Sequence, residues 1–145
     1  MDKTGFDRVL HVALSVPGEL LNEQGSKDLV RFFEELFGWQ DHPLLTRAGK
    51  SLIMGADAYE PLLFLHASKE PTQAAKHDHF AFGVKTMEQL QSVMTRAKKF
   101  AESDERATVY DYRMQDYKVA KLHSFFVRFL IPLKVEVQFL EIVAG

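Results

Sequence analysis

The sequence predicts an α+β protein built from two copies of one β-α-β-β-β module. Three observations support this fold class. The pattern H-x-A-x-x-V occurs twice, in the strand-like runs 11–16 and 79–84. A helical pattern follows each run, because apolar residues recur there at spacings of three and four. Several short strand-like segments then follow each helix, which argues against a parallel sheet in which strands and helices alternate throughout.

The first module is predicted over about residues 8–68 of a single 145-residue domain. It begins with a strand at 8–16. Ser26 is expected to cap a helix that ends at Gly38, because serine is a frequent N-cap residue and glycine frequently ends a helix. Three strands separated by glycine-containing turns should follow, at about 40–47, 50–56 and 61–67.

A polar segment at about 69–78 is the expected linker, and the second module is predicted over about 79–142. Its first strand is expected at 79–85. Thr86 and Gln89 have the spacing of a capping box at the start of a helix. The expected apolar face of this helix consists of Leu90, Met94, Ala97 and either Phe100 or Ala101. The remaining strands are expected at about 106–113, 122–130 and 133–142.

Each repeat histidine lies on the small-residue face of its strand, because side chains alternate between the two faces. His11 shares its face with Ala13 and Ser15. His79 shares its face with alanine and glycine in the same way. Small neighbours leave room for a ligand beside each imidazole. The alternative is that both histidines are ordinary hydrogen-bonded residues, since buried polar groups are normally satisfied.

The last predicted strand carries a third polar feature. Glu136 and Gln138 alternate with the apolar Val135 and Val137. If the apolar side packs on a helix, Glu136 and Gln138 point into the same interior as the two repeat histidines. Two imidazoles and one carboxylate form a facial set for Fe, Mn, Ni, Co or Zn as divalent ions. Such a metal ion can polarise a carbonyl or enediolate oxygen, or lower the pKa of bound water.

Composition narrows the function classes. The chain has no cysteine, which excludes disulfides and thiolate chemistry. A net charge of -2 gives no reason to expect nucleic acid or an anionic membrane as a partner. No apolar run approaches the roughly 20 residues that span a bilayer. The segment 1–5 lacks the apolar core of a signal peptide, so a cytoplasmic protein is expected.

Four segments, in their order along the chain, carry a family resemblance. They are Leu10-His11-Val12-Ala13-Leu14, the run FFEELFGW at 32–39, HFAFGV at 79–84, and FFVR at 125–128 leading to VEV at 135–137. Together they resemble the vicinal oxygen chelate superfamily, which includes glyoxalase I, bleomycin-resistance proteins and extradiol dioxygenases. The resemblance implies curled mixed sheets around a cleft, a homodimer, and metal ligands at His11, His79 and Glu136.

The chain departs from the family pattern at two places. The usual Asp-Pro-x-Gly turn is replaced by FLIPL at 129–133. Alignment without gaps places the family glutamate on Glu136, whereas alignment on the proline places it on Gln138; Glu136 is preferred because it supplies a charge. The fourth ligand of glyoxalase I falls on Phe64. His66 has the same strand parity and either replaces this ligand, lines the cleft or caps the strand.

Two tyrosines are further candidates for the ligand pocket. Tyr110 and Tyr112 are expected on one face of a single strand, where they either line the cleft or pack.

Three functions are compatible with these features. The first is a metal-dependent lyase, isomerase or dioxygenase that acts on a small oxygenated or aromatic substrate, and the three-ligand set favours it. The second is a bleomycin-resistance type protein that binds a small-molecule ligand without catalysis. The altered turn and the missing fourth ligand favour this second function. The third is a structural or interaction domain that has kept the fold and lost the site.

Overall fold

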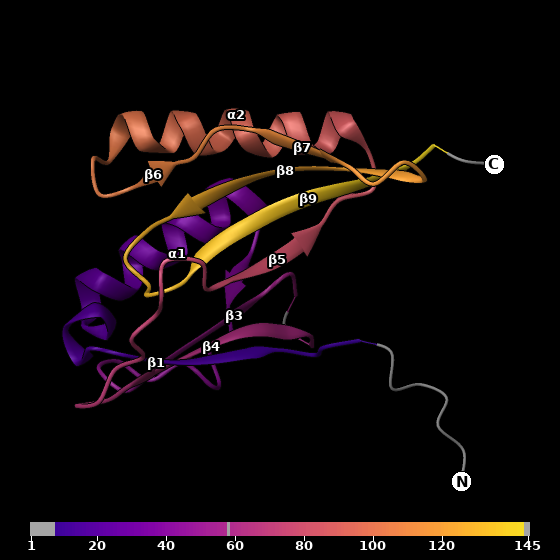
Figure 1. Ribbon diagram of the computed structural model, residues 1–145. Coiled ribbons are helices and arrows are strands. Elements are labelled where there is room, and N and C mark those ends of the chain that lie inside the picture. Colours follow the sequence, from indigo (N-terminus) through magenta and orange to yellow (C-terminus); the bar gives the residue numbers. More distant parts are fainter. Residues whose placement is uncertain (1–7, 58, 144–145) are drawn as a thin grey trace, which may run out of the picture. The chain divides into compact units, whose positions relative to one another are not determined.

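The structure is a computed structural model that describes residues 8–57 and 59–143 (Figure 1). The chain divides into two compact units, Met1–Thr72 and Gln73–Gly145. Each unit contains one long α-helix and one mixed sheet, and neither sheet closes into a barrel. The α+β class predicted from the sequence is therefore confirmed. No helix within the described ranges is long and apolar enough to cross a membrane.

The first unit has the strand order β1-β4-β3-β2, in which β1 is parallel to β4 and the other pairs are antiparallel. The elements are β1 (Val12–Val16), a short 3-10 helix η1 (Gly18–Leu21), α1 (Glu23–Phe37), β2 (Gln40–Asp41), β3 (Ser51–Gly55) and β4 (Pro61–Ala67). The predicted strands at 8–16 and 40–47 are therefore shorter in the structure.

The second unit has the strand order β5-β9-β8-β6, with β7 also paired to β8. The elements are β5 (His79–Gly83), α2 (Met87–Ser103), β6 (Thr108–Val109), β7 (Arg113–Asp116), β8 (Ala120–Arg128) and β9 (Lys134–Ile142). Helix α2 packs on β6, β8 and β9, and it lies along one side of this sheet in Figure 1.

The alternation of side chains along the strands explains part of the burial, whereas β3 is buried along its whole length and Glu136 of β9 is buried between two buried valines. In the first unit the apolar sides of β1, β3 and β4 are buried, as is one side of α1. In the second unit Val135 and Val137 of β9 are buried on the helix side. Removing each large apolar side chain from water contributes about 1.5–3 kcal/mol. The buried residues of α2 are Leu90, Val93, Ala97 and Phe100, so Val93 takes the buried place expected for Met94.

The helix ends are set by local hydrogen bonds. The Asn22 side chain accepts a bond of 2.8 Å from the backbone N–H of Gly25, so α1 begins earlier than expected and the predicted cap at Ser26 is wrong. Ser26 instead donates its hydroxyl to the Leu21 carbonyl. Gly38 ends α1 in the left-handed region, at φ 71°, as predicted. Thr86 caps α2 as predicted, accepting from the Gln89 N–H at 3.1 Å.

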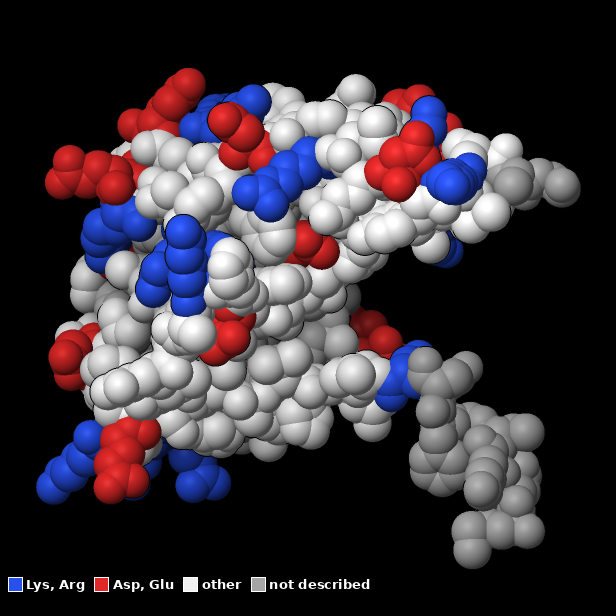
Figure 2. Space-filling model, viewed as in Figure 1, with Lys and Arg blue, Asp and Glu red and all other residues white. Residues whose placement is uncertain are grey.

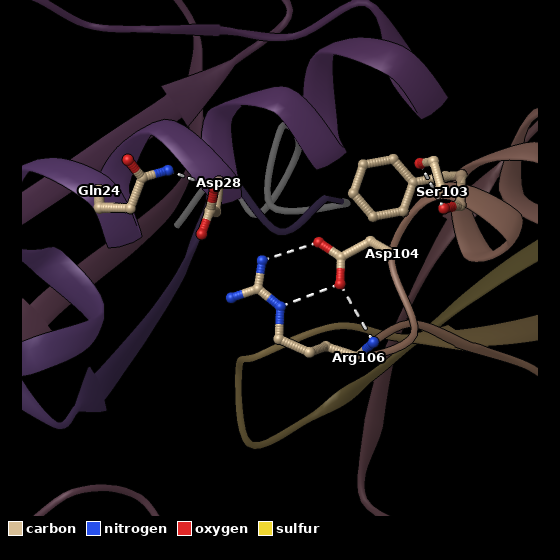
Figure 3. Close-up of polar contacts among 6 residues, drawn as sticks. Gln24, Asp28, Ser103, Asp104 and Arg106 are labelled. Atoms are coloured by element: carbon tan, nitrogen blue, oxygen red, sulfur yellow. Dashed lines mark hydrogen bonds and ion pairs between the residues drawn. The ribbon is translucent and has the colours of Figure 1, made fainter.

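Local polar contacts also fix helix ends and faces (Figure 3). After α2, the Arg106 guanidinium donates two hydrogen bonds to the Asp104 carboxylate, at 2.9 and 2.7 Å. In α1, the Gln24 side-chain amide donates to Asp28 one turn later, at 2.8 Å. The bidentate pair of Arg106 and Asp104 holds the start of the segment that leads into β6.

The predicted strand at 106–113 is split, and Tyr110 and Tyr112 do not share a face. Val109 pairs with Val127, whereas Arg113 pairs with Ser124. Between these two pairs, the segment from β6 to β7 therefore contains one residue more than β8 does. An extra residue on one strand of an antiparallel pair is a β-bulge. A one-residue shift reverses the faces of all following side chains. Tyr110 consequently shares a face with Lys134, and Tyr112 points to the opposite face.

Candidate functional site

The register of the second sheet places the polar candidates on one face. In the parallel pair of β5 and β9, His79 lies beside Lys134, Ala81 beside Glu136, and Gly83 beside Gln138. Residues paired in this way point to the same side of a sheet. His79, Glu136 and Gln138 therefore share the face opposite α2, as the strand parity predicted for these two strands.

The imidazole of His79 is oriented by the backbone. Its Nδ1 lies 2.7 Å from the carbonyl oxygen of His77. Because a carbonyl only accepts, Nδ1 carries the proton and donates it. The neutral ring then has its lone pair on Nε2, for which the described residues provide no hydrogen-bond partner. A backbone bond of this kind is the usual way in which a metal-binding histidine is held.

Glu136 is a mostly buried residue on the same face, with 8% of its surface exposed, and its carboxylate oxygens keep some contact with solvent. Its neighbours across the sheet are Ala81 and Phe126, neither of which offers a side-chain donor. Within residues 8–57 and 59–143, no hydrogen bond or ion pair reaches the Glu136 side chain. The carboxylate therefore has acceptor positions that no described residue uses, and a negative charge in a mostly buried position suits a cation.

Gln138 is the alternative to Glu136 and lies two residues further along β9. It is half-buried and lies between Gly83 and Ser124. Its side-chain amide is neutral and therefore offers a metal ion no charge. The electrostatic setting favours Glu136.

In the first unit the imidazole of His11 stacks on the ring of Phe64. The ring centroids are 4.3 Å apart and the planes differ by 9°. Phe64 stands at the position where the family resemblance places a fourth ligand. A phenyl ring cannot ligate a metal, so its contribution here is to hold the imidazole. His66 is exposed and pairs with Ser15, so both lie on the face that carries Phe64.

Two pockets border Phe64. One has a volume of about 340 Å³ and is lined by residues 8–11, 59–62 and Phe64. The other, of about 390 Å³, is lined by Phe64 and His66 together with residues of β3 and the loop before it. The face of the first sheet that carries His11 therefore offers space for a small molecule.

A hydrogen-bonded chain on the α2 side of the second sheet was not anticipated from the sequence. The hydroxyl of Tyr112 bonds to Nδ1 of His123, and Nε2 of His123 lies 2.7 Å from a Glu141 oxygen. Strand parity places His123 and Glu141 on one face, but their pairing depends on the register of β8 and β9. This chain lies on the face opposite Glu136.

His11 belongs to the first unit, and His79 and Glu136 belong to the second. In the part of the chain that the structure describes, no three His, Asp or Glu side chains form a metal-binding group. The convergence of the three predicted ligands stays a prediction.

Comparisons with known proteins give a likeness in structure only. No protein-family model matches the chain, and no curated protein matches its sequence. A solved glyoxalase/bleomycin resistance protein/dioxygenase from Alicyclobacillus acidocaldarius is similar at a TM-score of 0.64 and 14% identity, covering 92% of this chain and 91% of that one.

Two further solved structures have the same fold. Lactoylglutathione lyase from Agrobacterium tumefaciens matches at a TM-score of 0.60 and 17% identity, over 92% of this chain and 93% of that one. The fosfomycin resistance protein FosX from Listeria monocytogenes matches at 0.58 and 13% identity, over 91% and 92%. The chain therefore has the fold shared by the glyoxalase, bleomycin-resistance and dioxygenase proteins.

Proposed function

We propose that this protein binds one divalent metal ion through His11, His79 and Glu136 and acts on a small oxygenated or aromatic substrate. The reaction would be of the lyase, isomerase or dioxygenase type. The observation that carries the proposal is the position of Glu136 on the same sheet face as His79: the residue is 8% exposed, its carboxylate has no partner among the described residues, and Nε2 of His79 is available.

The donor set fits such an ion. Two neutral nitrogens and one anionic oxygen suit Fe, Mn, Ni, Co or Zn as divalent ions. When bound, the metal would polarise a substrate oxygen and stabilise the negative charge that develops on it. The chain's own contribution is orientation: the His77 carbonyl holds His79, and the Phe64 ring holds His11.

We also propose a homodimer, which the family resemblance implies. Leu140 and Ile142 support it, since they share one side of β9 and expose 53% and 68% of their surface. Exposed apolar side chains that gather on one element often mark an interface.

The second candidate function is the capture of a small molecule without catalysis. Phe64 favours it, because an aromatic ring occupies the place of a fourth ligand and borders both pockets of the first sheet. The solved structures of similar fold include proteins named for bleomycin or fosfomycin resistance. A ligand held by apolar walls and a few polar groups is the usual content of such pockets.

Metal analysis by mass spectrometry, on untagged protein purified without chelators, tests the first candidate. We expect about one divalent ion per chain in the wild type and almost none in the His79→Ala variant. His77→Ala is the matched control, because it removes a neighbouring imidazole and keeps the backbone carbonyl that orients His79. It should retain the metal.

Stoichiometric metal in a folded His79→Ala variant would show that the ligand assignment is wrong. If the wild type takes up none of the divalent ions of Fe, Mn, Ni, Co and Zn, each added in turn, the metal-dependent function is wrong. The remaining candidates are then small-molecule capture and a domain without a site.

A further inference from the structure

A pocket in the second unit collects three cationic side chains. It has a volume of about 260 Å³ and lies where β8 ends and β9 begins. Its lining includes Lys76, Arg128 and Lys134, together with Tyr110 and Asp78. All of these residues belong to the unit Gln73–Gly145.

Three cationic side chains and one carboxylate, that of Asp78, leave this pocket with an excess of positive charge. Among the described residues, no ion pair engages Lys76, Arg128 or Lys134. The one acidic residue of the lining, Asp78, accepts the backbone N–H of Ala75 at 2.8 Å. Cations gathered in a concave site raise the local potential and attract an anion.

The clustering of positive charge in this pocket differs from the distribution of charge over much of the surface drawn in Figure 2. On the face shown in Figure 2, acidic and basic side chains are interspersed and neither sign dominates. The chain as a whole carries a net charge of -2. Three unpaired cations in one pocket are therefore a local feature and do not follow from the composition.

Lys134 is held in place by aromatic rings. Its Nζ lies 5.4 Å from the Tyr110 centroid and 5.2 Å from the Phe126 centroid. Cation–π contacts of this kind position an ammonium group without using its N–H donors. Those donors stay available to an oxyanion.

The pocket adjoins the second-unit part of the proposed metal site. Lys134 pairs directly with His79 across the sheet, and it lies two residues before Glu136 on the same face. The ring of Phe126 contacts both groups, with its centroid 5.2 Å from the His79 ring centroid. A molecule bound at Lys134 therefore has His79 as an immediate neighbour.

We propose that this pocket binds the oxyanion of the substrate, a carboxylate or a phosphate group. The inference rests on the proposed function and narrows its substrate class to organic anions. Arg128 offers a planar fork suited to two oxygens, and the two lysines act as point charges. The remainder of the substrate would extend along the sheet toward His79.

Isothermal titration of the full chain, freed of metal by a chelator and at low ionic strength, tests the inference. The probes are inorganic phosphate and benzoate. The probe that binds with the higher affinity shows whether the pocket prefers a phosphate or a carboxylate. We expect Lys134→Gln and Arg128→Gln each to weaken binding about tenfold, which is the loss expected for one charge-assisted hydrogen bond. Lys98→Gln, an equal loss of charge on the exposed side of α2, should bind as the wild type does.

Metal analysis of the same variants separates the two proposals. We expect Lys134→Gln to keep its metal, and His79→Ala to keep its affinity for the anion. Equal anion affinity in all variants, or no binding of either probe, would overturn the pocket assignment and leave the metal site standing. A wild type that binds the anion through Lys134 but takes up none of the metal ions when each is added would overturn the metal site and leave the anion pocket. Circular dichroism confirms that each variant is folded.

Discussion

At the scale of single residues, the most informative feature of the second unit is that Glu136 lies in a mostly buried position without a hydrogen-bond donor. The residue is 8% exposed, and its sheet neighbours are alanine and phenylalanine. Folding therefore removes most of this residue's surface from water without supplying a donor to the carboxylate, whose oxygens keep some contact with solvent. Such a cost is retained in proteins mainly where the group has a functional partner.

Replacing Glu136 with glutamine should have opposite effects without and with metal. In metal-free protein we expect Glu136→Gln to raise the free energy of unfolding by up to about 1 kcal/mol, because a charge without a donor in a mostly buried position is replaced by a neutral amide. In the presence of metal, the wild type should gain stability that the variant does not gain. Thermal unfolding of both proteins, with and without added metal, measures the two effects.

Gln138→Glu is the informative companion variant. It places a carboxylate at the other candidate position, on the same face of β9. If Gln138→Glu restores metal-dependent stabilisation to Glu136→Gln, both positions reach the ion. If Glu136→Gln is stabilised by metal as strongly as the wild type, Glu136 is not a ligand.

At the scale of elements, backbone packing explains where α1 begins. Asn22 caps the helix, and η1 directly precedes it. At Gly25, in the first turn, a Cβ atom would lie 2.3 Å from the Leu20 carbonyl oxygen. The close approach of η1 is therefore possible only because residue 25 has no side chain.

Gly25→Ala should therefore destabilise the protein, although alanine is the better helix former by about 1 kcal/mol. The clash involves backbone atoms, which cannot move aside as a flexible side chain can. We expect a loss of about 1–3 kcal/mol in the free energy of unfolding, measured by urea denaturation. Gly83→Ala is the control, because no atom lies within 4 Å of its added Cβ. A Gly25→Ala variant as stable as the wild type would contradict the packing argument.

The split between β6 and β7 has a consequence at the same scale. The extra residue between Val109 and Arg113 turns Tyr110 toward Lys134 and Tyr112 toward His123. One tyrosine thus lines the cationic pocket, and the other joins the hydrogen-bonded chain with Glu141. The bulge assigns two similar residues to two different environments.

At the scale of the whole molecule, the proposed homodimer is directly testable. Light scattering should give twice the mass of the chain. Ile142→Glu, which places a charge among the exposed apolar side chains of β9, should give a monomer. Leu44→Glu is the matched control, because Leu44 is also exposed but lies in the first unit. A wild-type monomer would contradict the proposal, and a dimeric Ile142→Glu variant would move the interface away from β9.

The sequence alone determined the features that depend on local periodicity. Alternation along β5 and β9 was sufficient to place His79 and Glu136 on the faces that the structure gives them, because side chains in a strand have a strict period of two. Gly38 and Thr86 were found at helix ends because capping depends on residues a few positions apart.

Only the tertiary structure decided the features that depend on register and on contacts distant in sequence. The sequence shows no periodic signature for the split strand, for the burial of Glu136 without a donor, or for the gathering of Lys76, Arg128 and Lys134. Each depends on which residue of one segment lies beside which residue of another, and a shift of one position would change all the partners. For that reason the candidate residues could be named from the sequence, whereas the environments that suggest their chemistry could not.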